Sequence, residues 1–357
     1  MKILIIIHSF TPGGGEKQAI IDANSLINYG HEVTLAFHRE GALHRLLSNK
    51  VKLYHIRFQN VFFAALQLFF HFLYNRYAVI HSHMIWEETI SALPALLTGH
   101  KIIFNEQGLE KWRKWHHIFT MNIISRCASK IITPCEATKK LRILREKINE
   151  KKLITIYNSY NNHCEINHPS AVPHGWKDED AYVIGFVGRL TRVKKIHTFI
   201  HIADHLKKSF SNLKIIMVGD GDEKESFVQQ IIENNLDQYF IVEGFVLNVS
   251  SYYPLFDVFV LPSATEALSL SLIEAGAEGI PSIAYDVGGN SEIIIDGITG
   301  YLIPAYNVKL LIEKIEYLFF HKEKRLAMGA AAKKHILTNF SATKRINELM
   351  NLYKEIC

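Results

Sequence analysis

Short runs of apolar residues alternate with longer stretches of helical periodicity along the whole chain. The apolar runs are continuous rather than alternating, which is typical of parallel strands covered by helices on both faces. The first half of the chain contains runs at Ile3–His8, Glu32–Phe37, Lys52–Ile56, Val79–His83, Lys101–Asn105, Lys130–Pro134 and Leu153–Tyr157. The second half contains runs at Tyr182–Val187, Lys214–Val218, Phe240–Glu243, Val258–Leu261, Pro281–Tyr285 and Tyr301–Ile303. Two such sets predict an α/β protein with two doubly wound, Rossmann-like domains.

The boundary between the two domains is predicted within Asn158 to Asp180. This segment is rich in Asn, His, Pro and Gly and has no apolar periodicity, which indicates a linker. We therefore expect a first domain over residues 1–165 and a second over residues 166–341. A final helical pattern over residues 342–357 is expected to pack back toward the first domain. Ligands of open parallel sheets bind outside the carboxyl ends of the strands, so we expect the site in a cleft between two facing domains.

The most apolar helical stretch is Val61–Tyr74. It is shorter than the roughly 20 apolar residues that a spanning helix needs, and Gln67 and His71 interrupt it. Two interpretations are open for it. One is a core or crossover helix packed on a sheet, which its length favours; the other is a helix partly exposed to lipid headgroups.

The formal charge of +5 is divided unevenly along the chain. Residues 1–165 contain 21 Lys and Arg against 12 Asp and Glu, whereas residues 166–357 contain 19 against 23. A basic first half indicates an anionic partner, such as a membrane surface or nucleic acid, although solvated helix faces give the same composition. No known nucleic-acid-binding module accompanies the charge, so nucleic acid is the weakest candidate.

Two basic clusters in the first half suit peripheral contact with anionic lipid headgroups. The first places cations beside interfacial aromatic residues, and the second adds charge without aromatic residues; ordinary surface residues are the alternative in both cases. The clusters consist of Trp112, Arg113, Lys114, Trp115, His116 and His117, and of Lys139, Lys140, Arg142, Arg145, Lys147, Lys151 and Lys152. Four cysteines without paired spacing and an N-terminal apolar run too short for a signal peptide favour a cytoplasmic protein.

A basic loop follows the predicted strand that ends at Val187. Arg189 and Lys194 lie in this loop behind Gly188. Arginine offers a planar fork for phosphate oxygens and lysine offers a compact charge, so the pair could clamp a diphosphate. A solvated basic loop before a helix is the alternative.

Two glutamates, Glu266 and Glu274, flank the start of a predicted helix after the strand Val258–Leu261. Ser269 is the predicted N-cap of that helix. Unpaired backbone amides at such a helix start favour a phosphate, and a carboxylate beside them suits the hydroxyls of a ribose or sugar. Acidic residues that merely complement the helix dipole are the alternative.

A third motif, Gly13-Gly14-Gly15-Glu16, separates the first strand from the first helix. Glycine there lets the backbone approach a ligand closely, but the spacing is not that of a dinucleotide fingerprint. Asp220-Gly221-Asp222 is similar to a pair of metal-binding aspartates, and we discount it because the basic loop already supplies positive charge for a diphosphate.

Taken together, these motifs make the whole chain resemble glycosyltransferase family 4, a group of retaining enzymes with the GT-B architecture. The resemblance depends on the order of the motifs, because each one alone is weak. They are Gly13-Gly14-Gly15-Glu16, Val79–His83, Gly188-Arg189-Leu190 with Lys194, Val218-Gly219-Asp220-Gly221, Pro262-Ser263 with Glu266 and Glu274, and Gly288-Gly289-Asn290-Ser291-Glu292 with Gly297 and Gly300.

The resemblance implies a role for each matching residue. Arg189 and Lys194 would bind the donor diphosphate, and Glu266 would lie near the transferred sugar, as the catalytic set. The donor-binding set would be Gly14, Gly15, Gly188, Val246, Ala267, Leu268, Ser269 and Glu274, with Glu274 holding the ribose hydroxyls. The donor is expected to be a nucleotide-diphosphate sugar, most simply a UDP-sugar, with no metal ion and no other cofactor.

The sequence departs from the family pattern at the acceptor side. Many members carry a histidine after the strand that ends near Phe104, and here that segment is Asn105-Glu106-Gln107-Gly108. His83, Glu106 and Gln107 are the candidates on this side. Smaller departures are Ala267 and Lys195, each at a position where the family usually has glycine.

The leading interpretation is therefore a cytoplasmic glycosyltransferase that transfers a sugar with retention to a hydroxyl of a glycan or lipid-linked acceptor. Its expected roles are the synthesis of cell-surface polysaccharide or lipopolysaccharide, with peripheral contact at the inner face of the membrane. A sugar-nucleotide epimerase or hydrolase, or a non-catalytic sugar-binding subunit, is the alternative. An epimerase or hydrolase would consume donor without acceptor.

Overall fold

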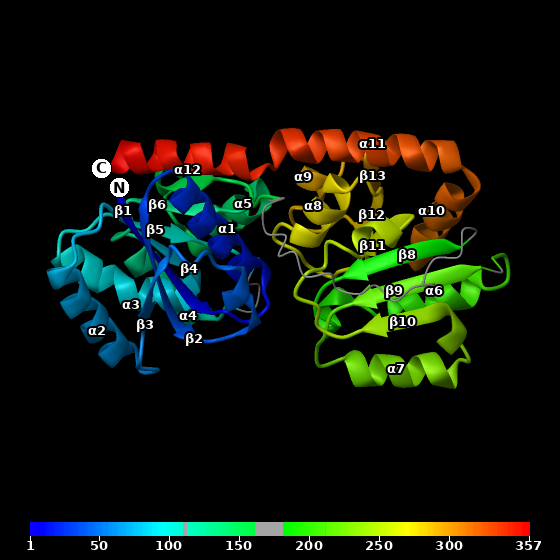
Figure 1. Cartoon of the computed structure of the whole chain (residues 1–357), viewed down its shortest axis with the longest axis horizontal. Coiled ribbons are helices and arrows are strands. Elements are labelled where there is room, and N and C mark those ends of the chain that lie inside the picture. The colour runs from blue at the N-terminus through cyan, green and yellow to red at the C-terminus, as the bar shows by residue number, and fades with distance from the viewer. Residues whose placement is uncertain (110–112, 161–180, 211) are drawn as a thin grey trace. The chain divides into compact units, whose positions relative to one another are not determined.

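The computed structural model describes residues 1–109, 113–160, 181–210 and 212–357. Trp112 and most of the expected linker therefore lie outside the described residues. The chain divides into two compact units (Figure 1). Unit 1 comprises Met1–Cys164 together with Ser341–Cys357, and unit 2 comprises Glu165–Phe340.

Unit 1 contains a parallel sheet of seven strands in the order β3-β2-β1-β4-β5-β6-β7. Its strands are β1 Lys2–Ser9, β2 Glu32–Arg39, β3 Lys52–His55, β4 Val79–His83, β5 Ile102–Asn105, β6 Lys130–Thr133 and β7 Leu153–Thr155. The order runs outward from β1 toward β3 on one side and from β4 toward β7 on the other. The switch point of this sheet is therefore between β1 and β4, which pair directly.

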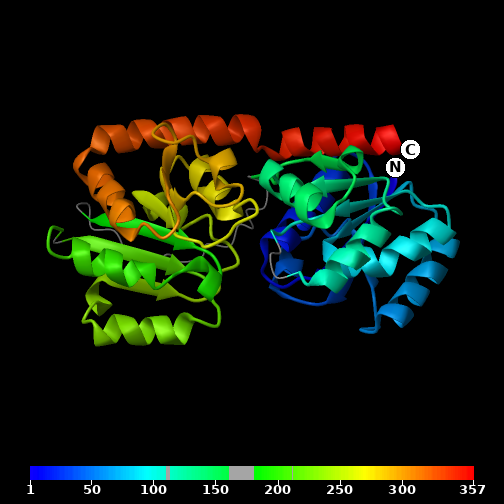
Figure 2. The ribbon, with the colours of Figure 1, turned by 180° about the vertical axis from the view of Figure 1, so that it is seen from behind.

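Helices cover both faces of this sheet. Those of unit 1 are α1 Gly14–Asn28, α2 Val61–Tyr74, α3 Met84–Leu97, α4 Trp115–Ile124, α5 Glu136–Glu146 and α12 Ala342–Ile356, with short 3₁₀ turns at Ala42–Leu46 and Glu150–Lys152. Helices α2, α3 and α4, blue to cyan-green in Figure 2, share one apolar core with Leu4 and Ile6 of β1. Helix α12 lies alongside α1.

A buried ion pair fastens α12 to unit 1. Arg345 donates from Nε and one terminal nitrogen to the two carboxylate oxygens of Asp22 on α1, at 2.7 Å each. Its other terminal nitrogen donates to the carbonyls of Ile156 and Tyr157 at 3.0 and 2.8 Å. Both charged side chains are only 2% exposed. Such a pair holds the helix in one position because breaking it would leave a buried charge.

Unit 2 contains a parallel sheet of six strands in the order β10-β9-β8-β11-β12-β13. Its strands are β8 Tyr182–Val187, β9 Leu213–Val218, β10 Phe240–Glu243, β11 Val258–Leu261, β12 Ser282–Tyr285 and β13 Gly300–Ile303. Its helices are α6 Thr198–Leu206, α7 Lys224–Glu233, α8 Leu270–Ala277, α9 Asn290–Ile293, α10 Val308–Phe320 and α11 Lys322–Asn339, with 3₁₀ turns at Arg192–Lys194, Asp237–Tyr239 and Tyr253–Leu255. The switch point is between β8 and β11.

The predicted fold class is confirmed, because each predicted strand is present and all strands pair in parallel within two sheets. The interpretation of Val61–Tyr74 as a core helix holds for one stripe only. Ala64, Leu68 and Phe72 are buried, but most of the other apolar side chains of α2 are exposed. Among the described residues, none of the helices has both the length and the apolar character needed to cross a bilayer.

Candidate functional site

The predicted donor-binding residues gather at the switch point of unit 2. Arg189 and Lys194 follow β8, while Glu266 and Ser269 follow β11, and these two strands are neighbours in the sheet. A backbone hydrogen bond from Ala264 N–H to the Val193 carbonyl, 2.8 Å long, joins the two loops. The carboxyl edge of the sheet therefore brings the basic loop and the acidic elbow together.

Close backbone packing fixes the basic loop. A Cβ atom at Gly219 would lie 2.0 Å from the carbonyl oxygen of Gly188, and one at Gly221 would lie 2.3 Å from that of Leu190. The two loops also share hydrogen bonds from Gly188 N–H to the Val218 carbonyl and from Leu190 N–H to the Asp220 carbonyl, at 3.0 and 2.9 Å. Glycine is required at 219 and 221 because any side chain would push the two loops apart.

Lys194 and Glu266 form an ion pair at the centre of this site. Lys194 Nζ lies 2.5 Å from Glu266 Oε1, and the side chains are 19% and 10% exposed. Arg189 is exposed and has no ion-pair partner within the described part of the chain. Lys195 has a φ of 52°, the left-handed region that glycine adopts most readily, so the turn keeps its shape despite the absence of glycine.

Helix α8 begins at the acidic elbow. The side chain of Ser269 accepts a hydrogen bond from Leu272 N–H at 3.4 Å, which confirms the predicted N-cap. The Ala267 carbonyl accepts from Gly289 N–H at 2.8 Å, so the glycine loop after β12 supports the elbow. Glu274 Oε2 accepts from the hydroxyl of Tyr253 at 2.7 Å. Tyr253 is buried, so its hydroxyl orients the carboxylate for which the family resemblance implies contact with the ribose.

The remaining predicted residues of unit 2 also lie at this carboxyl edge. Val246 follows β10, and a hydrogen bond of 3.2 Å from Gly219 N–H to the Gly244 carbonyl joins its segment to the loop after β9. Asp220 accepts from Gly221 N–H at 2.9 Å in a tight turn. Among the described residues, no group of three or more His, Cys, Asp or Glu side chains is arranged to hold a metal ion.

In unit 1, the predicted residues of the glycine loop and of the acceptor side lie around one edge of the sheet. Helix α1 begins at Gly14, and a Cβ atom at Gly15 would lie 3.1 Å from Cβ of Gln107. Both polar atoms of the Gln107 amide are engaged, one with Asn105 at 2.8 Å and the other with Asn158 at 2.9 Å. His83 is buried, and burial lowers its pKa well below 6.5, so its imidazole is neutral at physiological pH.

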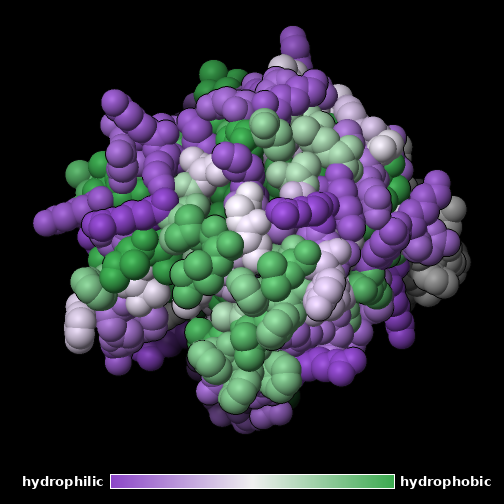
Figure 3. All heavy atoms as spheres, turned by 90° about the vertical axis from the view of Figure 1, so that its left-hand side faces the viewer, coloured by the Kyte–Doolittle hydropathy of each residue, from purple (hydrophilic) through white to green (hydrophobic). Residues whose placement is uncertain are grey.

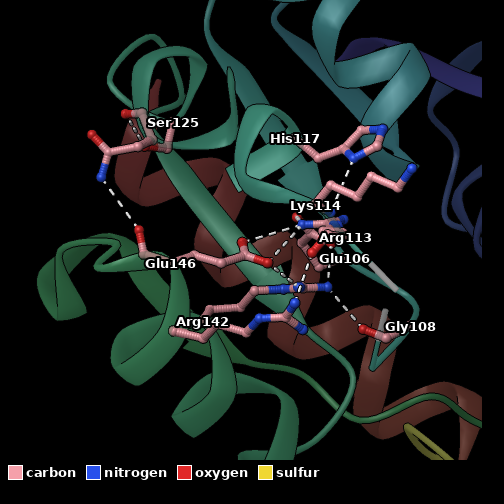
Figure 4. A network of polar contacts seen from close by, with 10 residues as sticks. Glu106, Gly108, Arg113, Lys114, His117, Ser125, Arg142 and Glu146 are labelled. Atoms are coloured by element: carbon pink, nitrogen blue, oxygen red, sulfur yellow. Dashed lines mark hydrogen bonds and ion pairs between the residues drawn. The ribbon is translucent and has the colours of Figure 1, made fainter. Parts of the chain in front are cut away.

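Glu106 belongs to a buried network of ion pairs (Figure 4). Its Oε2 accepts from Arg113 at 2.7 Å and from Arg142 at 2.8 Å, and both arginines also bind Glu146. Burial alone would raise the pKa of Glu106, but Arg142 and Arg113 outweigh it and lower the pKa below 4.5. In this structure Glu106 therefore holds the segment after β5 in place and does not reach the surface.

Several cations of the two predicted basic clusters bind partners within unit 1. Arg113 and Arg142 are buried in ion pairs, and Lys152 donates to the carbonyls of Ser125, Arg126 and Ala128. These cations therefore stabilise unit 1 internally rather than form a basic surface. The sequence did not indicate this, because their carboxylate and carbonyl partners come from other elements.

Comparison with known proteins places both halves of the chain in described families. Residues 12–162 match the family described as Glycosyltransferase Family 4, and residues 173–335 match the family described as Glycosyl transferases group 1. A capsular polysaccharide biosynthesis glycosyltransferase, CapM of Staphylococcus aureus, is 26% identical over 74% of this chain and 73% of its own length.

Two further relatives share most of the chain. The UDP-Gal:alpha-D-GlcNAc-diphosphoundecaprenol alpha-1,3-galactosyltransferase of Escherichia coli is 22% identical over 78% of this chain and 76% of its own. The crystal structure of HepE from Anabaena in complex with UDP-glucose superposes with a TM-score of 0.86 at 19% identity, over 99% of this chain and 100% of that one. The fold is therefore GT-B, and the chain is a glycosyltransferase whose N-terminal half matches the family described as Glycosyltransferase Family 4 and whose C-terminal half matches the family described as Glycosyl transferases group 1.

Proposed function

We propose that this glycosyltransferase moves a sugar, with retention of its anomeric configuration, from a UDP-sugar to a hydroxyl of a glycan or lipid-linked acceptor in the synthesis of bacterial cell-surface polysaccharide. The names of the relatives support this assignment. One makes capsular polysaccharide, another uses UDP-galactose and a sugar on diphosphoundecaprenol, and the structural neighbour binds UDP-glucose.

The observation that carries the proposal is the arrangement of charge at the switch point of unit 2. Lys194 pairs with Glu266 just before the N-terminus of α8, where backbone amides and the helix dipole also favour an anion, and Arg189 adds a second cation from the same loop. Glu266 and Glu274 provide carboxylates that accept hydrogen bonds from hydroxyl groups. A diphosphate between a ribose and a hexose is a ligand that offers both kinds of group.

The reaction follows from these roles. The bond between the anomeric carbon and the diphosphate oxygen breaks, and the acceptor oxygen bonds to that carbon on the same face. The acceptor proton passes to the departing diphosphate. Arg189 and Lys194 stabilise the negative charge that develops on the leaving group, an effect worth about 3–4 kcal/mol for one well-placed donor in other enzymes. Because these two cations supply the positive charge, we propose that the reaction needs no metal ion, and full activity in the presence of a chelator is the expected result.

The donor is tested by thermal unfolding in the presence of UDP-, GDP- and ADP-sugars. We expect UDP-sugars to raise the melting temperature, since a ligand at 100 times its Kd stabilises the native state by about 2.7 kcal/mol. Glu274→Gln should reduce the rise given by UDP more than the rise given by a UDP analogue that lacks the ribose 2′- and 3′-hydroxyls. A larger rise with GDP- or ADP-sugars than with UDP-sugars would overturn the assignment of the nucleotide.

The anomeric configuration of the transferred sugar is tested in a separate experiment. Retention predicts that the anomeric proton of the product has the coupling constant of the donor's α or β configuration, which proton NMR measures. Release of free sugar at the same rate with and without an acceptor would instead support a hydrolase.

We also propose that unit 1 binds the surface of an anionic membrane through α2 and the end of α3. Figure 3 shows apolar side chains gathered on one face of unit 1. They are Val61, Phe62, Phe63, Leu66, Phe70, Leu73 and Tyr74 of α2, and Leu93, Leu96 and Leu97 of α3, which we call the apolar ridge. Phe58, Phe63, Leu66, Phe70 and Tyr74 also line an open groove of about 440 Å³. An exposed apolar surface of this extent is unusual on a protein without a partner.

Charge around the apolar ridge favours anionic lipid as that partner. Between residues 57 and 109 the cations Arg57, Arg76 and Lys101 are all exposed. In the same range each carboxylate, from Glu87, Glu88 and Glu106, is buried. Aromatic and leucine side chains flanked by cations, with no exposed carboxylate between residues 57 and 109, suit the headgroup region of an anionic bilayer. We expect sedimentation with vesicles that contain phosphatidylglycerol and none with vesicles of phosphatidylcholine alone; equal sedimentation with both would contradict the electrostatic part.

A further inference from the structure

A histidine and a buried glutamate meet at the switch point of the sheet in unit 1. His8 lies near the carboxyl end of β1, and Glu87 lies in the first turn of α3, directly after β4. His8 Nδ1 is 2.9 Å from Glu87 Oε1, and the side chains are 37% and 1% exposed. Since β1 and β4 are neighbours, this is the edge of the sheet where an open parallel fold binds its ligand.

Aromatic rings surround His8. Its ring centroid is 5.5 Å from that of Trp86 in an edge-to-face contact and 5.6 Å from that of His38 on β2. The rings of His38 and Trp86 are 5.4 Å apart. Small-molecule sites are usually lined by apolar rings, which contribute contact area, and by a few polar atoms, which fix the orientation of the ligand. A half-exposed histidine within an aromatic cluster is similar to such a lining.

The turn that places these residues is strained. Met84 begins α3 with a φ of 70°, a left-handed conformation that is uncommon for a residue other than glycine. Strain of this kind persists only where the surrounding structure enforces it, and it concentrates at functional sites. Met84 also adjoins the glycine loop, because a Cβ atom at Gly15 would lie 3.8 Å from its sulfur. The His8–Glu87 pair is therefore continuous with the loop that the sequence singles out.

The surroundings of His8 and Glu87 raise the pKa of both groups, so the pair tends to keep a proton. The hydrogen bond to Glu87 is the main cause that raises the pKa of His8 above 6.5, with Glu16 acting in the same direction and burial and Arg39 opposing it. Burial is the main cause that raises the pKa of Glu87. Whichever atom carries the shared proton, Nδ1 is occupied by Glu87. Nε2 has no hydrogen-bond partner within the described residues, so it is the nitrogen that a ligand would meet.

We propose that His8 binds a hydroxyl of the acceptor sugar through Nε2, with Trp86 against the sugar ring and Glu87 as the positioning residue that orients the imidazole. This inference rests on the proposed function, because it names the acceptor site of the same enzyme. It also supplies a polar group on the acceptor side, where the segment after β5 has no histidine and His83 is buried.

The experiment is proton–carbon NMR of the histidine rings during titration with methyl glycosides of glucose, galactose and N-acetylglucosamine. The His8 signal is identified by its loss in His8→Gln. We expect at least one glycoside to shift the His8 signal, and we expect Glu87→Gln to weaken the apparent affinity about tenfold, which is the effect of one lost hydrogen bond to a charged group. Glu87→Asp should restore part of the affinity, and His205→Gln, at an exposed pair with Glu316, should change nothing.

A pH titration of the same signal tests the positioning role. The pKa of His8 should fall in Glu87→Gln, because the hydrogen bond to Glu87 is the main cause that raises it. The other groups around the ring, Arg39, Glu16 and His38, are the same in both proteins. An unchanged pKa would contradict the role of Glu87, and no glycoside-dependent shift of His8 would contradict the acceptor site. Binding of UDP, measured on the same sample by calorimetry, separates the two proposals. If UDP binds and no glycoside shifts the His8 signal, only this inference fails. If UDP does not bind, the proposed function itself fails.

Discussion

At the scale of single residues, the ion pair between Lys194 and Glu266 lies at the centre of the proposed donor site. Its two charges are mostly buried, so in the absence of donor each neutralises the other. A diphosphate would draw Lys194 toward its own oxygens and leave Glu266 to accept from the sugar. If the proposed function is correct, the donor would replace the internal ion pair with two contacts of its own, one to Lys194 and one to Glu266.

Substitution of this pair is expected to have unequal effects. Lys194→Ala should weaken UDP binding about 10- to 100-fold, because it removes a charge-assisted hydrogen bond to phosphate. Glu266→Gln should not weaken UDP binding, because it releases Lys194 from its internal partner. Isothermal titration calorimetry measures both, with Lys207→Ala in the surface pair with Asp204 as the matched control. Wild-type affinity in Lys194→Ala would refute the assigned role.

The sequence identifies residues whose role follows from the spacing of their neighbours along the chain. It does not identify residues whose partners are distant in the sequence. Ser269 is predictable as an N-cap because the apolar pattern begins just after it. Tyr253 as the partner of Glu274, and Glu87 as the partner of His8, give no such signal. Each pair joins side chains from separate elements, and only the packing of those elements brings the two polar atoms within hydrogen-bond distance.

At the scale of elements, α12 and the segment after β5 are each held by buried charges. For α12 this charge is Arg345, which binds Asp22 and two carbonyls. Arg345→Met should lower the free energy of unfolding by about 3–5 kcal/mol, because Asp22 would be left buried without its cation. Urea unfolding measures the loss. Lys309→Met, which removes an exposed pair with Glu313 on α10, should cost less than about 1 kcal/mol. Equal effects of the two substitutions would contradict the anchoring role of Arg345.

The network around Glu106 predicts a dependence of stability on pH. Its pKa in the folded protein lies below the ordinary value of 4.5, so the folded state gains stability from the ionised carboxylate above that value. As the pH falls below about 4.5, protonation removes this contribution. Glu106→Gln should therefore destabilise the protein strongly at pH 7, by about 3–5 kcal/mol, and progressively less toward acid.

Urea unfolding at a series of pH values tests the role of Glu106. Glu313→Gln is the matched control, because its carboxylate is exposed and its pair with Lys309 is 4.0 Å long. It should have a small effect at every pH. A difference between wild type and Glu106→Gln that does not shrink on acidification would show that the carboxylate contributes by packing rather than by charge.

Elements differ in how far the sequence predicts them. The strands are recognisable because buried parallel strands are apolar throughout, as in Ile3–Ile7. Helix α2 is less predictable, since its residues are apolar on every side and the pattern alone does not mark which stripe faces the core. The packing of Ala64, Leu68 and Phe72 into the core of unit 1 decides this, and it leaves Phe62, Phe63 and Phe70 exposed.

At the scale of the whole molecule, the apolar ridge predicts a specific loss of membrane binding. The double substitution Phe62→Ser and Phe70→Ser should reduce sedimentation with phosphatidylglycerol vesicles at least tenfold, because each large aromatic side chain contributes about 1.5–3 kcal/mol when it leaves water. Leu326→Ser with Leu337→Ser, two exposed apolar positions on α11 of unit 2, is the matched control and should sediment like wild type. Similar losses in both variants would point to general adhesion rather than to the ridge.

Because α12 belongs to unit 1 although it follows unit 2 in the sequence, it affects the order in which the two units fold during synthesis on the ribosome. Asp22 is synthesised long before its cation, because Arg345 follows 323 residues later. Unit 2 is continuous in sequence and complete at Phe340, whereas unit 1 has all its strands by Thr155 but lacks one of its helices until α12 has been made. Domains generally fold as units in the order of their synthesis, but unit 1 cannot be completed before α12, so we expect unit 2 to reach its final structure first. A nascent chain halted before Ser341 would then bind UDP while its first unit was still incomplete.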